Sequence, residues 1–173
     1  MSAVTANDAP SAGPRPALHC RAMNARTRAA AAELLGAFLA DDAHYRASAA
    51  HYGDGGRPAL ERALDLFLAH PEVGFVWLAS TPDGTVAGAC VVCHAISTSR
   101  GSLVAKLDDV TIREGWQGRG VGTTMLEALA TDLRARGVGR IDTACHRDNA
   151  GAWRFYERLG YRSLDEERLA LLL

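Results

Sequence analysis

Three alternating glycines separate a strand-like segment from a helix-like one. Gly118, Gly120 and Gly122 follow the apolar run SLVAKLDDVTI and open the segment VGTTMLEALATDLRA. Glycine costs backbone entropy, so this density indicates a local requirement. A glycine-rich turn at a helix N-terminus presents successive backbone N–H groups and the positive end of the helix dipole. The stretch predicts an anion site for a di- or triphosphate ligand, with a tight structural turn as the alternative.

Two common phosphate-binding motifs fit this stretch poorly. A P-loop needs a lysine followed by serine or threonine after its last glycine, and no lysine stands there. A dinucleotide fingerprint needs a third glycine where this chain has Thr123, although Asp142 lies about 20 residues on, where a ribose-binding acid is expected. The stretch also follows a predicted antiparallel hairpin and not a first β-α-β unit. Nicotinamide dinucleotide binding stays a weaker alternative.

The segment QGRGVG, from Gln117 to Gly122, resembles the Q/R-x-x-G-x-G/A motif of the GNAT superfamily of N-acetyltransferases. LDDVTIREGWQGRGVG resembles that family's fourth strand and pyrophosphate loop, and HRDNAGAWRFYERLGYR resembles the segment after its fifth strand. The similarity covers about residues 103–162. It implies acetyl-coenzyme A as co-substrate, with no metal. It also implies a single-domain α/β fold in which helices flank a mixed sheet and a parallel strand pair forms the acetyl-coenzyme A site.

The resemblance assigns the coenzyme to the glycine-rich turn and to the strand before it. The amides from Gly118 to Thr123 face the pyrophosphate, and Val110 and Ile112 offer backbone groups to the pantetheine arm and the thioester oxygen. Asn149 matches an asparagine that contacts the coenzyme, with an N-cap role as the alternative. The expected coenzyme-binding residues are Val110, Thr111, Ile112, Gln117, Gly118, Arg119, Gly120, Val121, Gly122, Thr123, Asn149 and Ala152.

Acetyl transfer to an amine also needs an acid and a base. Tyr156 occupies the family's general-acid position, where it protonates the leaving thiolate; a core tyrosine is the alternative. An alkylamine of pKa ~10.4 is only about one part in a thousand neutral at pH 7, so a carboxylate near it helps. Asp108 matches a glutamate of polyamine acetyltransferases but is one methylene shorter, which favours a contact through water. Alternation points Asp109 to the other face of the strand, and Asp109 and His146 are the further candidates for the base.

Composition narrows the class of protein. The chain has 173 residues, of which 48% are hydrophobic, and this fits one domain. Its net charge of −1 gives no basic field for nucleic acid or an anionic membrane. No apolar run approaches the ~20 residues that span a bilayer, and the N-terminus lacks the apolar centre of a signal peptide. We expect a cytoplasmic protein with a flexible tail over residues 1–17 and an N-acetyltransferase domain over residues 18–173.

Periodicity and turn residues predict the elements that position these groups. A strand over 18–23 precedes a helix that Asn24 caps and that runs to about Asp42. A second helix begins at Pro58 and ends before the His70-Pro71 pair. The remaining elements are strands over 73–80, 85–96 and 102–112, a helix over 120–136, a strand over 137–146, a helix over 149–159, and one or two strands to the end of the chain. The helix between strands 102–112 and 137–146 predicts that these two strands run parallel.

The loop from Asp41 to Gly56 is the candidate acceptor pocket, because the family builds that pocket from its first two helices and their connection. The residues that could attract a cationic amine or line the pocket are Asp41, Asp42, His44, Tyr45, His51 and Tyr52. Arg100 and Lys106 favour instead an acceptor that carries a carboxylate. We expect a primary amine of a small molecule, such as a diamine, polyamine or amino acid, to attack the thioester directly in a ternary complex. Dimers are common among the proteins that this chain resembles, so the resemblance is compatible with a homodimer.

Two alternatives to this function come from other classes. One is a catalytically idle acyl-coenzyme A-binding module, and the other is an acetyltransferase that acts on a protein or peptide amine. The tyrosine at position 156 and the acid at position 108 favour an active enzyme. The C-x-x-C formed by Cys90 and Cys93 lies in a β-rich run, so we interpret both as small apolar strand residues.

Overall fold

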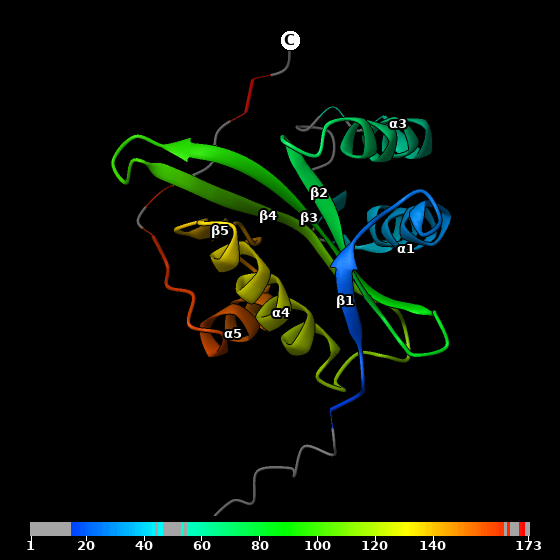
Figure 1. Cartoon of the computed structure of the whole chain (residues 1–173). Coiled ribbons are helices and arrows are strands. Elements are labelled where there is room, and N and C mark those ends of the chain that lie inside the picture. The colour runs from blue at the N-terminus through cyan, green and yellow to red at the C-terminus, as the bar shows by residue number, and fades with distance from the viewer. Residues whose placement is uncertain are drawn as a thin grey trace, which may run out of the picture.

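The computed structural model describes residues 15–43, 45–46, 53, 55–164, 166 and 170–171. Within these residues, five strands form one sheet with helices on both of its faces (Figure 1). None of the helices in this part of the chain has the length and apolar character of a membrane-spanning segment. The elements in chain order are β1 (His19–Ala22), α1 (Arg28–Asp41), α3 (Gly56–Ala69), β2 (Gly74–Ser80), β3 (Val86–Ser97), β4 (Ser102–Ile112), α4 (Val121–Ala135), β5 (Ile141–Thr143) and α5 (Ala150–Arg158).

The sheet has the strand order β1-β2-β3-β4-β5. The strands from β1 to β4 pair antiparallel, whereas β4 and β5 pair parallel and are connected through α4. The turn TPDG joins β2 to β3, with the Gly84 N–H donating to the Thr81 carbonyl at 2.9 Å. The predicted hairpin, mixed sheet and parallel pair are therefore confirmed, and with them the α/β fold class.

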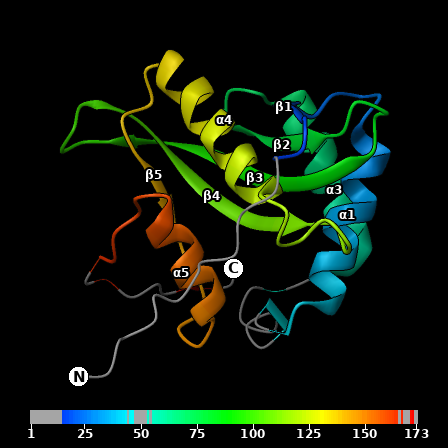
Figure 2. The same cartoon turned by 90° about the horizontal axis from the view of Figure 1, so that it is seen from below.

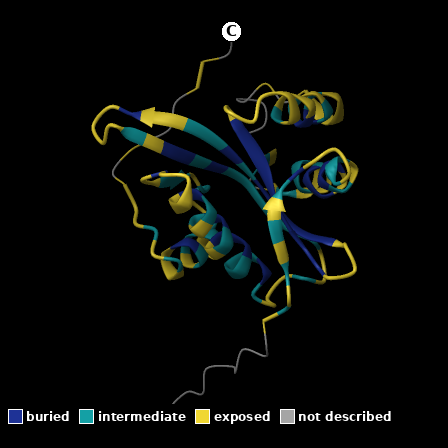
Figure 3. Cartoon of the chain, in the orientation of Figure 1, coloured by how far each residue is buried: buried dark blue, intermediate teal, exposed yellow. Residues whose placement is uncertain are grey.

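Two apolar clusters cover the two faces of the sheet. Helices α4 and α5 lie on one face (Figure 2), and Met125 and Leu129 of α4 share a buried cluster with Trp77 of β2. The indole N–H of Trp77 donates to the Met125 carbonyl at 3.2 Å, which gives the polar atom of this buried ring a partner. On the other face, Leu35 of α1 and Leu64 of α3 pack on β2 and β3. Burial is complete along β2 and the first five residues of β3, whereas β4 is mostly half-buried (Figure 3), so both helical layers rest on the same central strands.

The two N-terminal helices begin at other residues than the sequence predicts. The Asn24 side chain accepts hydrogen bonds from two backbone N–H groups of the following turn, at 2.9 and 3.2 Å, so it caps that turn and α1 begins only at Arg28. Helix α3 begins at Gly56, which makes Pro58 its third residue and not its first. Proline is tolerated there because the first four N–H groups of a helix have no intrahelical acceptor.

The C-terminal part also differs in length from the prediction. Strand β5 covers only residues 141–143 of the expected 137–146, because Gly137, at φ 78°, still belongs to the turn that ends α4. Helix α5 agrees with the prediction, including Asn149 as its N-cap residue and Gly160 at φ 87° after its end. Residues 161–164 form no strand, and most of the remaining C-terminal residues lie outside the described part of the chain.

Candidate active site

Strands β4 and β5 separate near the middle of β4. They pair at only three positions, residues 105–107 with 141–143, and Leu107–Thr143 is the last pair. Val110, Thr111 and Ile112 lie beyond this pair, where β4 continues along β3. The two parallel strands thus form a fork that opens toward their C-terminal ends. Ligands of open α/β sheets bind at this end of the strands.

A β-bulge in β4 stands at the beginning of the fork. Between consecutive pairs, β3 advances by two residues and β4 by three, so β4 carries one extra residue there. Asp109 at this point has a φ of 50°, in the left-handed region that aspartate tolerates better than most residues. Because of the extra residue, Leu107 and Val110 both pack into the cluster under α4. The regular alternation expected for Asp108 and Asp109 is therefore interrupted.

Beyond the bulge, β4 directs backbone groups into the fork. The Arg113 N–H donates to the Ala87 carbonyl of β3 at 2.9 Å. Alternation along the strand then points the N–H and C=O groups of Val110 and Ile112 away from β3, toward the β5 side. The Ile112 carbonyl accepts a hydrogen bond from Gln117 Nε2 at 3.3 Å, which ties the beginning of the glycine-rich turn to the strand. Val110 and Ile112 are the two residues expected to contact the pantetheine arm.

The three glycines have two different structural reasons. Gly118 and Gly120 have φ values of 71° and 81°, which favour glycine, and Gly120 is the N-cap residue of α4. Gly122 lies within α4, and a Cβ atom there would lie 3.2 Å from the Phe155 ring of α5. Gly122 thus has a packing reason of its own, because the missing side chain allows α5 to approach α4 closely.

The other residues of the turn act through their backbone or lie at the surface. The Val121 side chain is buried in the core under α4, so only its N–H is directed to the helix N-terminus. The Arg119 guanidinium lies 5.7 Å from the centre of the Trp116 ring, within cation–π distance. Thr123 is half-buried one residue after Gly122. The turn thus has the architecture of an anion site, with glycines and backbone N–H groups at the N-terminus of α4.

Tyr156 places its phenol at the apex of the fork. The side chain is only 8% exposed, and its ring lies 5.3 Å from the Tyr161 ring. It hydrogen-bonds the side chain of Thr143, whose hydroxyl donates to the Leu107 carbonyl at 3.0 Å across the last β4–β5 pair. Burial raises the pKa of Tyr156 to about 12, although the bond with Thr143 lowers it. The phenol is thus protonated at neutral pH, as a proton donor must be.

Asp108 is paired with Lys106, two residues earlier on the same face of β4. Lys106 Nζ lies 2.7 Å from Asp108 Oδ2, and both side chains are partly exposed. Burial raises the pKa of the neighbouring Cys93 thiol, the Asp108 and Asp109 carboxylates raise it further, and Lys106 lowers it. The Asp108 charge also contributes to the raised pKa of Tyr156. The expected acid therefore lies within electrostatic reach of Asp108, and Asp108 and Asp109 both lie within reach of Cys93.

Two cations, Lys106 and Arg100, favoured an acceptor that carries a carboxylate, and the structure gives each of them another neighbour. Lys106 is engaged by Asp108. Arg100 lies in the β3–β4 turn against Gly139, where a Cβ atom would meet its Nε at 3.0 Å. From the start of β4 to Asp109 the strand extends roughly 20 Å, at ~3.3 Å per residue. Neither cation is therefore placed to hold an acceptor carboxylate at the fork.

The residues before α5 form its N-terminal cap. Asn149 Oδ1 accepts from the Ala152 N–H at 2.9 Å, which confirms the capping role and leaves the side-chain NH2 group of Asn149 as a donor. His146 Nδ1 accepts from the Asp148 N–H at 3.3 Å, so this imidazole takes part in the same turn. Asn149 and Ala152, both expected at the coenzyme, are thus neighbours at the beginning of the helix that carries Tyr156.

Only part of the expected acceptor loop lies within the described residues. Tyr45 packs on Phe38 of α1, with ring centres 6.1 Å apart, and its N–H donates to Asp42 Oδ1 at 2.7 Å. Asp41 is the last residue of α1. His44, His51 and Tyr52 lie outside the described residues. The described part therefore brings Asp42 and Tyr45 together at the C-terminal end of α1.

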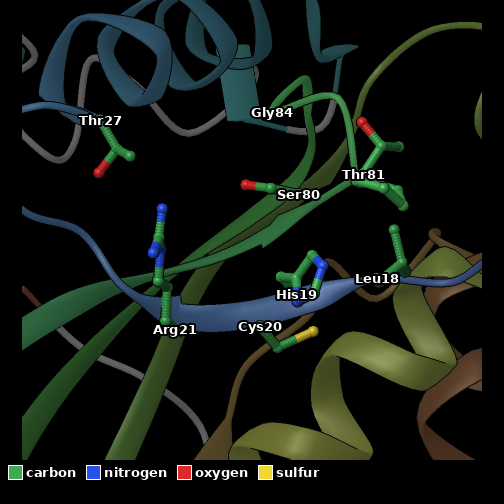
Figure 4. Close-up of a pocket in the computed structure, with 9 residues that line it drawn as sticks. Leu18, His19, Cys20, Arg21, Thr27, Ser80, Thr81 and Gly84 are labelled. Carbon is green, nitrogen blue, oxygen red and sulfur yellow. The ribbon is translucent and has the colours of Figure 1, made fainter.

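A shallow hollow lies at the opposite edge of the sheet, along β1 (Figure 4). His19 and Arg21 of β1 line it together with Ser80 and Thr81 at the end of β2. The Thr81 hydroxyl is engaged by Asp83 and by the Thr85 carbonyl. Strands β2 and β3 separate this hollow from β4, so it is distinct from the fork and contains none of the predicted site residues.

The mixed sheet with its forked parallel pair defines a class of α/β folds, and comparison with known proteins assigns the family. The model of the acetyltransferase (GNAT) family matches residues 40–161. Solved structures with this fold include a probable acetyltransferase, with TM-score 0.72 and 18% identity over 90% of this chain and 97% of that one. The protein therefore belongs to the GNAT acetyltransferase family, as the sequence motifs predicted.

Two further solved structures share the fold at low identity. Glucosamine-6-phosphate N-acetyltransferase from Arabidopsis thaliana has TM-score 0.65 and 14% identity, over 90% of this chain and 98% of that one. A predicted acetyltransferase from Clostridium acetobutylicum, solved with acetyl-coenzyme A, has TM-score 0.66 and 14% identity, over 90% and 96%. At this identity the likeness concerns the fold, while the family supports acetyl transfer and the use of acetyl-coenzyme A.

Several features of the site had no clear signal in the sequence. The bulge at Asp109 depends on pairing with β3, and a residue such as aspartate, which tolerates a positive φ, is only a weak indication of it. The role of Thr143 follows from its position at the last β4–β5 pair, which the sequence did not delimit. The stacking of Arg119 on Trp116 was not predicted either, although the two lie three residues apart in the turn.

Proposed function

We propose that the protein is an acetyl-coenzyme A-dependent N-acetyltransferase whose acceptor is a primary amine of a small molecule. The observation that carries the proposal is the fork between β4 and β5, which has backbone groups of β4 on its open side and a buried phenol at its apex. A catalytically idle coenzyme-binding module would need the fork but would have no use for a protonated tyrosine there.

The coenzyme is held along the fork by the chain's own backbone. The amides from Gly118 to Thr123 bind the pyrophosphate, aided by the dipole of α4. Val110 and Ile112 provide hydrogen bonds to the pantetheine arm, and one of their N–H groups polarises the thioester oxygen. The Asn149 side-chain NH2 group, free of the capping bond, is a further donor. These contacts place the thioester carbon beside Tyr156.

Transfer then proceeds by direct attack in a ternary complex. The acceptor nitrogen forms a bond to the acetyl carbon while Asp108, through a water molecule, takes the ammonium proton. The C–S bond breaks, and Tyr156 gives its proton to the departing thiolate. The amide product keeps only one proton on nitrogen, so the second one passes through water to the phenolate and restores the phenol, while Asp108 releases its proton to solvent. Because Asp108 Oδ2 is engaged by Lys106 Nζ at 2.7 Å and the side chain is one methylene shorter than a glutamate, a relay through water suits Asp108 better than direct abstraction.

A small amine that carries no carboxylate fits the described charges best. Asp108 and Asp109 both lie at the fork with Lys106 paired to Asp108, which leaves one more negative than positive charge among these three side chains, and Arg100 is remote. The carboxylates favour a cationic acceptor, such as a diamine or polyamine, by Coulomb attraction. The Arabidopsis protein, by its name, acetylates an amine of a small sugar phosphate, which shows only that this fold accommodates small acceptors.

The function is tested by incubation with acetyl-coenzyme A and a panel of diamines, polyamines, amino acids, aminoglycosides and peptides. We expect a gain of one acetyl group, read by mass spectrometry, on diamines or polyamines. Modification of peptides alone would move the acceptor to a protein amine. Tight binding of acetyl-coenzyme A without any product would favour the idle module.

Gly120→Val is expected to abolish coenzyme binding while the protein stays folded. The substitution forces a β-branched residue to φ 81°, at a cost of ~1–2 kcal/mol, and places methyl groups beside the amides. Gly137→Val is the matched control, because it has φ 78° and open surroundings at the other end of α4. Calorimetry with acetyl-coenzyme A and circular dichroism measure both variants. Equal loss of binding in both would contradict the local role of Gly120.

Tyr156→Phe is expected to lower kcat by about 10²–10³-fold, the usual contribution of a general acid, with little change in coenzyme affinity. The ring packing is kept and only the hydroxyl is lost. Steady-state kinetics and calorimetry separate the two effects. Tyr161→Phe is the control, since Tyr161 packs on Tyr156 and burial raises its pKa as well. Unchanged turnover in Tyr156→Phe would remove the residue from the mechanism.

Asp108→Asn is expected to lower kcat by at least about 10²-fold, while Asp109→Asn keeps most of the activity. Asparagine tolerates the left-handed backbone of position 109, so the second variant removes a charge and preserves the bulge. Turnover at pH 7 and at pH 9 measures both effects, since a more alkaline solution deprotonates more of the amine and reduces the need for a base. The opposite order of the two variants would assign the base to Asp109.

A further inference from the structure

The chain segment before β1 passes beside the N-terminus of α4. A Cβ atom at Gly120 would lie 3.5 Å from Cγ of Arg15. The guanidinium of Arg15 reaches Glu127, with Nη1 at 2.8 Å from Oε2. Figure 1 shows the stretch before β1, in dark blue, at this end of α4. A residue more than a hundred positions away in sequence thus lies on the glycine-rich turn.

The pairing of Arg15 with Glu127 is easily exchanged. The two side chains are 58% and 52% exposed, and ion pairs of this kind are weak because solvent screens them. A guanidinium binds phosphate through two parallel hydrogen bonds, and a pyrophosphate carries more charge than one carboxylate. A phosphate group at the α4 N-terminus is therefore a stronger partner for Arg15 than Glu127.

Two other arginines lie around the turn, and each has contacts of its own. Arg113 donates to the Val86 carbonyl at 2.7 Å and to Glu33 at 2.9 Å. Arg119 lies over the Trp116 ring. Arg15 is the cation whose stem rests on the αL glycine and whose present partner is a solvent-exposed carboxylate on the same helix.

We propose that Arg15 is a phosphate-binding residue for the coenzyme. When acetyl-coenzyme A binds, the guanidinium leaves Glu127 and pairs with a phosphate group at the Gly118–Thr123 amides. The inference rests on the proposed function, since it requires the coenzyme at this turn. It extends the site to a segment that lies outside the glycine motif and outside the part of the chain that the family model matches.

The test is the dissociation constant of acetyl-coenzyme A for Arg15→Met, measured by calorimetry at several salt concentrations. We expect about tenfold weaker binding, the order of one charge-assisted hydrogen bond, and a smaller dependence on salt. Arg21→Met is the matched control, because Arg21 is an exposed arginine of the adjoining strand β1, where it lines the hollow. It is expected to bind as the wild type does.

Two further arms separate phosphate binding from a structural role. Glu127→Gln removes the present partner of Arg15 and is expected to bind the coenzyme equally or more tightly. Binding of 3′-dephospho-coenzyme A assigns the phosphate: a loss in Arg15→Met that persists with this ligand points to the pyrophosphate, and a loss that disappears points to the 3′-phosphate.

Three results would overturn the inference. The first is an unchanged affinity for acetyl-coenzyme A in Arg15→Met, and the second is tighter binding in that variant. The third is an equal loss of affinity in Glu127→Gln, because it would indicate that the ion pair only shapes the turn. If the wild-type protein binds acetyl-coenzyme A and Gly120→Val does not, any of these three results overturns the role of Arg15 and leaves the proposed function intact. If the wild-type protein does not bind it, the proposed function fails and the role of Arg15 with it.

Discussion

The early end of the pairing between β4 and β5 is the constraint on which the site depends. A strand in the middle of a sheet normally satisfies its N–H and C=O groups on both sides. Beyond Leu107 and Thr143, β4 continues along β3, and its other side opens into the fork. A ligand with its own amides, such as a pantetheine arm, can complete that side as a strand would. The proposed binding of the coenzyme at the fork therefore needs no special side chain on β4.

The helices keep the fork open and fix its apex. Helix α4 is anchored to the sheet by its apolar stripe and by the bond from Trp77 to the Met125 carbonyl. Helix α5 can approach α4 because position 122 is a glycine facing Phe155. This close contact holds the next residue, Tyr156, against Thr143. The position of the phenol is thus a consequence of helix packing, and a larger residue at position 122 would displace it.

Local patterns in the sequence predicted most of the fold, because the elements follow hydrophobic periodicity and turn chemistry. The bounds of β4 agree with the structure, and so does the capping role of Asn149. The errors arose at positions whose backbone conformation depends on residues elsewhere in the chain. The bulge at Asp109 depends on the register with β3, and the short β5 depends on the turn at Gly137. The motif likewise gave no indication of Arg15, whose place beside Gly120 depends on the path of the chain before β1.

The cysteines near the fork bear on whether the acetyl group passes through a covalent acetyl-enzyme or is transferred directly to the amine. A covalent acetyl-enzyme would need a nucleophile, and thiolates are the reactive form of cysteine. Burial raises the pKa of Cys90, Cys93 and Cys145 above its ordinary value, so all three are thiols at neutral pH. Cys90 is also fully buried beneath α4. With these three cysteines protonated and a proton donor at the apex, attack by the amine itself on the bound thioester is the simpler route.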